Sequence, residues 1–435
     1  MDLNEWRPYR ITTIADVFKV YFRLAKKYTI RMEYDLEDYK NRRINFTFGN
    51  LRRASIDFIR FLLVSVFLAT MILARDTESI LSAKRFETML EIDRIDLLFL
   101  LYMAVSSLLE YLWIYTFWEI LVYDSAYNEF IAIQYKFDDS KLESNNKRLL
   151  LKYFIIRGYL MGIAYKIYAL FFMGLFTILS HKHYALYVTD QVTLLDLVSV
   201  LIPFFILMYH LIFVSGQMFL VMFCFEFSIR FLRIRFQQLC SSATIQINRL
   251  NPLPTRFMRM YYEIYANIAK FNQSAQNYFF VTELLSKINM IFLTVFYSKQ
   301  TQLKSSSFLI LYISVQMIVN TTLVYHMVSF FATKNLLYYR SLLINFIRFQ
   351  FVTKRTSSPL YTKARPRNLI SMKAKRYDCS ADLKKNFFLQ TMPSNMIGFT
   401  CGRLFLITSY KYVELLLMNL IFILLFYKKL LLKEL

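Results

Sequence analysis

The side chains that could do chemistry are scattered along the chain, and their spacing builds no catalytic site. His181 and His183 flank a lysine, which is a weak metal-binding pattern, and two solvated histidines on an outer loop are the simpler interpretation. No nucleophile with a neighbouring base and no glycine-rich phosphate loop is visible. We therefore predict that the protein is not an enzyme and uses no metal or cofactor. The cysteines make no C-x-x-C pair, so neither a zinc site nor a disulfide framework is indicated; they are Cys224, Cys240, Cys379 and Cys401.

Ionisable residues inside long apolar stretches are more informative, because a charge in such a stretch is costly and suggests function. Most lie toward one end of their stretch, which favours pairing between helices or snorkelling to a membrane surface. Two pairs of opposite charge, Glu283 with Lys287 and Lys411 with Glu414, are four and three residues apart, so each pair can meet along one helix face. His210 and His326 are expected to hydrogen-bond between helices. The charged residues are Glu110, Glu119, Arg157, Lys166, Glu283, Lys287, Lys411 and Glu414.

The apolar stretches that hold these residues are long enough to cross a membrane, which takes about 20 residues in a helix. The chain is 57% apolar, with only seven glycines and seven prolines, which favours long helices over many short strands. Inside a bilayer the backbone must satisfy its own hydrogen bonds, so each stretch should be helical. Pro203 is the one proline expected to kink a span. Seven spans are predicted, near 56–74, 95–122, 154–180, 194–225, 278–297, 307–332 and 404–427.

The charged loops predict the orientation of these spans. The loops on the N-terminal side of the membrane carry about four times as many lysines and arginines as the opposite set, and such loops stay cytoplasmic. The N-terminus is therefore expected inside and the C-terminus outside, opposite to a G-protein-coupled receptor. The sequons at Asn45 and Asn272 are then cytoplasmic and Asn320 lies within a span, so all three should stay unglycosylated. The net charge of +23 reflects this orientation, and no nucleic-acid partner is expected.

The mass outside the membrane is expected on the cytoplasmic side. Amphipathic stretches follow spans four and six and precede span five, so these helices should continue into the cytoplasm and pack on each other and on neighbouring subunits. The alternative is that they lie on anionic lipid. The basic stretch 353–376 predicts a flexible loop attracted to lipid headgroups. Four segments result: a cytoplasmic segment 1–55, spans one to six with their helix extensions at 56–333, a helix extension and basic loop at 334–398, and the last helix with a short outer tail at 399–435.

This all-α architecture, with seven spans, small outer loops and helices four to six extended into a cytoplasmic anchor, resembles the insect chemoreceptor superfamily of gustatory and odorant receptors. Residues 399–405, Phe-Thr-Cys-Gly-Arg-Leu-Phe, resemble the Phe-Thr-x-x-Gly-x-Phe-like stretch that gustatory receptors carry before the last helix. The family hallmark in that helix is Thr-Tyr, five apolar residues, then Gln-Phe. Here Ile421-Phe422, five residues and Lys428-Lys429 keep the spacing and lose the polar groups. The resemblance is therefore to a divergent, gustatory-receptor-like protein.

The resemblance implies a ligand-gated cation channel that serves taste in the plasma membrane, as a homo- or hetero-tetramer of related subunits. The last helices would surround the pore, with Asn419 as a polar wall and Phe422 and Phe426 as a constriction that gates by dewetting. Lys429 shares this face, and a ring of lysines would repel cations. Cation conduction, anion permeation, a partner subunit or loss of channel activity therefore stay open. The alternative for the whole face is helix packing, with the lysines snorkelling.

The resemblance also implies a pocket for a small-molecule ligand in the outer halves of spans two to six. Apolar walls with a few polar groups suit such a ligand, and ordinary helix packing is the alternative for each residue. A non-conducting accessory or assembly protein of the same fold is a second hypothesis. A transporter is a third, but it predicts internal repeats and two broken helices, which are not seen. The expected pocket residues are Tyr102, Tyr168, Phe172, Phe292, Tyr312, Gln316 and Asn320.

Overall fold

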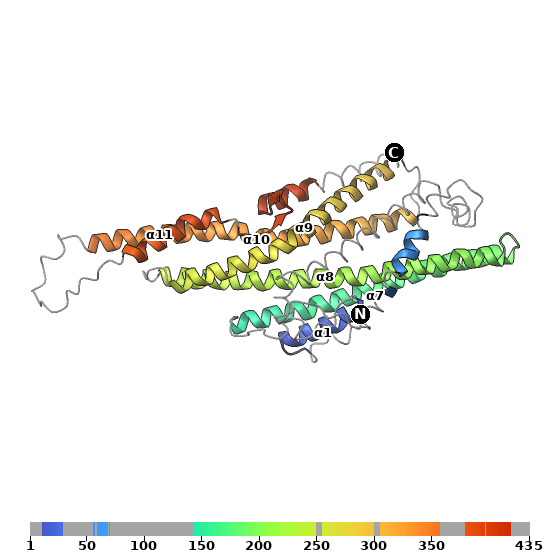
Figure 1. The fold of residues 1–435 in the computed structure, drawn as a ribbon, viewed down its shortest axis with the longest axis horizontal. Coiled ribbons are helices and arrows are strands. Elements are labelled where there is room, and N and C mark those ends of the chain that lie inside the picture. The colour runs from blue at the N-terminus through green and yellow to red at the C-terminus, as the bar shows by residue number, and fades with distance from the viewer. Residues whose placement is uncertain are drawn as a thin grey trace, which may run out of the picture. The chain divides into compact units, whose positions relative to one another are not determined.

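The computed structural model is mostly helical, and four long helices dominate it (Figure 1). Each is far longer than the stretch of about 20 residues that a bilayer requires. The described residues are 11–28, 55–56, 59–67, 69, 142–248, 255–299, 305–356, 379–395 and 397–418. The predicted second span lies outside them. The long helices are α7 (Ser144–Val188), α8 (Leu194–Asn248), α9 (Thr255–Lys299) and α10 (Ser305–Thr356).

Spans four, five and six each form one uninterrupted helix with the amphipathic stretch beside them. Helix α8 holds the fourth span and its continuation in 55 residues, and it passes through Pro203 without ending. Helix α9 joins the stretch before span five to that span, and α10 joins span six to the stretch after it. The predicted continuity is therefore observed. The basic loop predicted from 353 begins later, because α10 runs on to Thr356.

Helix α7 corrects the predicted outer loop at 181–193. It continues to Val188, so His181 and His183 lie on a helix, because no glycine or proline interrupts this stretch. Thr189 caps the C-terminal end of the helix, and its hydroxyl donates to the carbonyl oxygens of Ala185 and Leu186 in the last turn. Asp190 then takes a left-handed conformation with φ of 55°. Only residues 189–193 connect α7 to α8.

Two helices begin with the same reciprocal cap. Thr193 Oγ1 accepts from the Asp196 backbone N–H at 3.3 Å, and the Asp196 carboxylate accepts from the Thr193 N–H at 3.3 Å, before α8. Thr13 and Asp16 make the equivalent bonds at 3.3 and 3.0 Å before α1 (Ile14–Tyr28). Each pair satisfies backbone donors that the first helical turn leaves without a partner.

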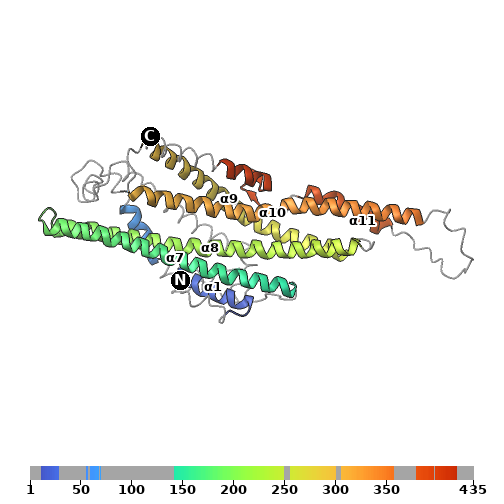
Figure 2. The same cartoon turned by 180° about the vertical axis from the view of Figure 1, so that it is seen from behind.

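The chain divides into two compact units. The first comprises residues 1–228, 284–318 and 422–435, and the second comprises 229–283 and 319–421. In the first unit α1 lies along α7 (Figure 2). Phe18 meets Phe227 edge to face at 4.5 Å between ring centroids, and Tyr21 stacks on Phe223 at 5.5 Å. This docked helix was not predicted, since 1–55 was expected only to be a cytoplasmic segment.

Much of the apolar surface of the first unit is exposed. Among the described residues, α7 and the Leu194–Gly216 part of α8 are long and apolar enough to cross a membrane. Only 12% and 33% of their most apolar stretches are buried inside the protein, and Leu170 and Leu195 are about three-quarters exposed at 72% and 71%. A helix from the core of a soluble protein would be mostly buried, so these faces require lipid or another chain.

The second unit packs parts of α8, α9 and α10 with α11 (Cys379–Ser394) and a small hairpin. Phe236, Tyr261 and Phe331 are fully buried, with ring centroids of Phe236 lying 6.4 and 6.3 Å from the other two. Strands β1 (Thr400–Cys401) and β2 (Phe405–Leu406) are antiparallel. Helix α11 was not predicted. Its helical conformation depends on tertiary packing, because its buried residues are few in a polar stretch.

Candidate functional site at the base of the last helix

The Phe399–Phe405 motif forms a tight β-hairpin that leads directly into the last helix. Thr400 pairs with Leu406 and Cys401 with Phe405, and the Ile407 N–H donates to the Phe399 carbonyl oxygen at 2.8 Å. Helical structure follows over residues 409–418. The hairpin therefore decides where and in which direction the last helix starts.

Phe399 anchors the hairpin in the core of the second unit. Its side chain is fully buried. The rings of Phe271, Phe279 and Phe331 surround it with centroid distances of 5.5, 5.9 and 5.7 Å. Burying an aromatic ring of this size contributes about 2 to 3 kcal/mol, so the hairpin is held as a packed element rather than as a surface loop.

One face of α9 supplies the polar contacts to the hairpin. The Thr400 backbone N–H donates to Asn272 Oδ1 at 2.7 Å, and Asn272 Nδ2 donates to Thr400 Oγ1 at 3.2 Å. Four residues further along α9, the carbonyl oxygen of Gln276 accepts from the Gly402 N–H at 2.8 Å. Backbone N–H groups at the edge of a sheet have no neighbouring strand to bind. Here α9 accepts from the edge N–H groups of Thr400 and Gly402, as a neighbouring strand would.

Gly402 is required for this close approach. Its φ is +57°, a left-handed conformation that other residues adopt only with strain. A Cβ at this position would lie 3.2 Å from the Cβ of Phe280 and 3.3 Å from its Cγ. Both the turn and the contact with α9 therefore demand glycine.

Helix α10 contacts the hairpin from a second direction. The Tyr325 hydroxyl donates to the Phe279 carbonyl oxygen at 3.3 Å and lies 3.5 Å from Cys401 Sγ. Burial raises the pKa of the Cys401 thiol, so it is a neutral, small packing group rather than a nucleophile. Tyr325 thus joins α9, α10 and the hairpin at one point.

The first turn of the last helix is capped and attached to α10. Thr408 Oγ1 accepts from the Lys411 N–H at 3.2 Å, as an N-cap residue does. The hydroxyls of Ser409 and Thr333 are 2.7 Å apart. One turn on, the rings of Tyr412 and His326 meet at 5.5 Å. His326 was predicted to hydrogen-bond between helices, which stays a prediction; its ring packs on Tyr412 of the last helix.

A buried polar chain joins α9, α10 and α11 further along the second unit. The Tyr261 hydroxyl donates to Asn335 Oδ1 at 2.8 Å, and Asn335 Nδ2 donates to the Met392 carbonyl oxygen at 3.1 Å. Burial raises the pKa of the Tyr261 hydroxyl, which keeps it a neutral donor. Phe388 of α11 packs edge to face on Tyr261 at 5.2 Å. The sequence contains no signal for this chain of bonds, because its members are dozens of residues apart.

The predicted ion pairs are partly observed. Lys411 and Glu414 pair at 2.7 Å at the expected spacing of three residues. Arg157 pairs with Glu226 at 2.7 Å, and the side chain of Glu226 is only 6% exposed. Glu226 was not among the predicted charges, since it lies just beyond the apolar stretch of span four. Interhelical pairing is therefore the role that the structure gives Arg157.

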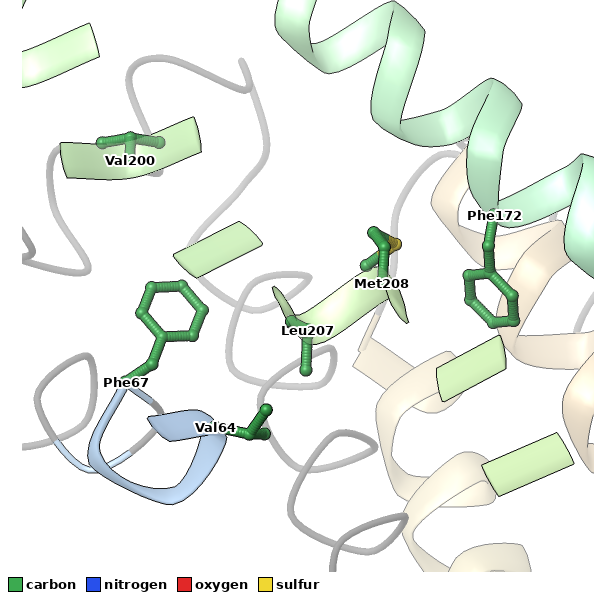
Figure 3. Packing of buried hydrophobic residues seen from close by; sticks show 6 residues of the cluster. All are labelled: Val64, Phe67, Phe172, Val200, Leu207 and Met208. Carbon is green, nitrogen blue, oxygen red and sulfur yellow. The ribbon is translucent and has the colours of Figure 1, made fainter. Parts of the chain in front are cut away.

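Among the predicted pocket residues, Tyr168 and Phe172 have described side chains, and both belong to an apolar cluster in the first unit. Tyr168 and Phe172 meet edge to face at 5.0 Å on α7. Phe172 is part of one buried apolar cluster with Leu207 and Met208 of α8 and with Val64 and Phe67 of the first predicted span (Figure 3). The cluster consists of apolar side chains, a composition that suits ordinary packing and would also suit an apolar ligand.

The other predicted site residues are not placed by the described side chains. Phe292 lies on α9, and Tyr312, Gln316 and Asn320 lie on α10. Tyr102 is outside the described residues. The predicted pore face is outside them as well, since the described part of the last helix ends at residue 418; it comprises Asn419, Phe422, Phe426 and Lys429.

Comparison with known proteins identifies the fold. No protein-family model and no curated protein sequence matches this chain. Among solved structures, the insect olfactory receptor OR5 from Machilis hrabei, determined in complex with eugenol, matches with a TM-score of 0.57. The match covers 95% of this chain and 97% of that one, at 11% sequence identity. The chain therefore has the fold of an insect olfactory receptor.

Proposed function

We propose that the chain is a ligand-gated ion channel subunit of the insect chemoreceptor superfamily, of the gustatory type, and that it acts as a tetramer in the plasma membrane. The observation that carries this proposal is the shared fold over nearly the full length of both chains. A likeness confined to a helical bundle would carry much less, since many unrelated proteins contain one. Here the match covers 95% of this chain and 97% of the other.

Exposed apolar side chains on α10 support assembly into an oligomer. Leu337, Ile344, Ile347 and Phe351 are all exposed, and their spacings of seven, three and four residues put them on one stripe. The stripe lies on the part of α10 predicted to extend into the cytoplasm, beyond the hydrocarbon core of the membrane. Neighbouring subunits, related to this one or identical to it, are the partners that would bury it.

In this proposal a small, mostly apolar molecule binds among the outer halves of the helices, and the last helices surround the pore. The apolar cluster around Phe172 supports the first part. The hairpin at 399–406 supports the second, because it fixes the start of the helix that carries the proposed pore residues Asn419, Phe422, Phe426 and Lys429. The short Phe-Thr-Cys-Gly motif supports the gustatory type.

A non-conducting accessory or assembly protein is a second proposal, favoured by Lys428 and Lys429. These replace the Gln-Phe pair of the family hallmark, and a ring of lysines opposes the passage of cations. Such a protein would share the fold and the assembly surface with channel subunits and would lack the current.

Recording ionic current from the full chain in planar bilayers, alone and with related subunits, separates the two proposals. A channel gives discrete openings with at least one panel of small apolar molecules. Replacing both lysines, Lys428→Gln with Lys429→Phe, should increase the cation current if the lysine ring limits conduction. Absence of current from both forms across broad panels supports the accessory role.

A further inference from the structure

We propose that Asn272 is a positioning residue that couples α9 to the last helix through the hairpin. Asn272, Gln276 and Phe280 are spaced four residues apart and form one stripe along α9. Each contacts the hairpin: Asn272 at Thr400, and Gln276 and Phe280 at Gly402. The role of the coupling in gating rests on the proposed channel function, whereas the positioning itself does not.

The contacts divide into those that a side chain makes and those that the backbone makes. Gln276 contributes its backbone carbonyl oxygen to the Gly402 N–H at 2.8 Å, and its side-chain Oε1 accepts from Thr400 Oγ1 only at 3.5 Å. Asn272 is different, because its amide serves Thr400 both as acceptor, at 2.7 Å to the backbone N–H, and as donor, at 3.2 Å to Oγ1. Removal of this side chain therefore breaks the shortest hydrogen bond between β1 and α9 and leaves the hairpin turn and the contacts of Gln276 in place.

The last helix starts between two helices that hold it in different ways. Helix α9 holds it through the hairpin, and α10 holds it directly through Thr333 and Ser409, whose hydroxyls are 2.7 Å apart. A movement of α9 along or around its axis, relative to α10, must then change the direction of the last helix. Because α9 is one helix to Lys299, it also carries Phe292, a residue of the proposed ligand pocket.

The test measures the mobility of the last helix with a spin label in the full chain in lipid nanodiscs. Tyr410 is 76% exposed and serves as the label site as Tyr410→Cys. Cys224→Ser and Cys379→Ser remove two native thiols, and Cys240 and Cys401 are buried and stay. Asn272→Ala should increase the mobile fraction of the label and raise amide exchange over 399–407 by about tenfold, since two hydrogen bonds are lost.

Matched variants separate positioning from general destabilisation. Asn277→Ala changes the same residue type at an exposed position five residues along α9 and should leave the label as in the parent. Asn272→Asp should restore the parental spectrum, because a carboxylate oxygen accepts from both the N–H and the hydroxyl of Thr400. Thr400→Val, which keeps the backbone bond, should give a smaller change in the same direction and serves if Asn272→Ala fails to fold.

The proposal is overturned if Asn272→Ala raises amide exchange in the hairpin and leaves the label unchanged, since the hairpin would then not position the helix. It is equally overturned if Asn277→Ala has the same effect as Asn272→Ala, or if Asn272→Asp fails to restore the spectrum. The spin label reports the mobility of the last helix and not ionic current. A chain that never conducts would therefore contradict the proposed channel function and leave this result standing.

Discussion

At the scale of single residues, Gly402 makes the sharpest prediction. Gly402→Ala should destabilise the protein by about 2 kcal/mol. An alanine here is strained in the left-handed backbone conformation, and its Cβ would lie too close to the Phe280 side chain. The thermal unfolding midpoint in detergent measures this. Gly174→Ala is the matched control: a Cβ there meets nothing within 4 Å, and alanine is the better helix former. Equal losses in the two variants would contradict the account.

The ion pair between Arg157 and Glu226 makes a second prediction. Glu226 is nearly buried, so Glu226→Ala or Arg157→Ala alone should cost about 3 kcal/mol, since each leaves the partner charge in a poorly solvated place. The double variant should cost clearly less than the sum of the two. Denaturant unfolding of the four forms gives the coupling directly. Simple additivity would mean that the pair contributes nothing.

Contacts between polar side chains could be predicted from the sequence only where the two residues are close along the chain. Lys411 and Glu414 are three residues apart, and their pairing follows from helix geometry. The hairpin motif at 399–405 was also visible as a motif. Its partner Asn272 was not, because it is 128 residues away and only tertiary structure brings it to Thr400.

At the scale of elements, the cap of α1 makes a third prediction. Asp16→Ala should weaken the helix by about 1 kcal/mol, because the Thr13 and Thr12 N–H groups lose their acceptor. Amide exchange over residues 17–21 should rise about fivefold by the same principle. Asp16→Asn keeps an acceptor oxygen and should retain much of the protection. Unchanged exchange in Asp16→Ala would contradict the cap.

The same cap has a defined pH dependence. Partial burial raises the pKa of Asp16, but hydrogen bonds from Thr13 and Thr12 outweigh this and lower it from 3.8 to about 2. A carboxyl with a depressed pKa stabilises the fold fully above its unfolded value, and the contribution is lost as the pH falls from there through about 2. Protection of α1 should therefore decline over this acid range in the parent and not in Asp16→Asn.

The long helices were predictable and the short ones were not. Apolar length and helical rhythm predict α8, α9 and α10 together with their extensions. Helix α1 is amphipathic and α11 is mostly polar; both are short, and each packs through a few aromatic contacts, such as Phe18 on Phe227 and Phe388 on Tyr261. Helices this short have little stability of their own and depend on the surface they pack against.

At the scale of the whole molecule, membrane orientation makes a fourth prediction. The connection 189–193 should face outward, so Gln191→Asn, which creates Asn-Val-Thr, should gain a glycan in cells. The natural sequons at Asn45, Asn272 and Asn320 should carry none. A mobility shift removed by a glycosidase measures both. A glycan at one of the natural sequons, with none added at position 191 in the variant, would reverse the orientation.

The proposed assembly rests on apolar surface that one chain leaves exposed. The stripe from Leu337 to Phe351 on α10 is apolar and exposed, and it lies on a helix expected to leave the membrane. The number of subunits does not follow from this stripe, because the same pattern suits dimers and larger rings. The number of four subunits is inferred from the proposed family, and so is a pore lined by the last helix.

Single-particle electron microscopy of the full chain in lipid nanodiscs tests this central claim most directly. We expect particles with four-fold symmetry, the last helices around the axis and the α10 stripes buried between neighbouring subunits. A homogeneous, stable monomer, prepared with or without related subunits, would contradict it.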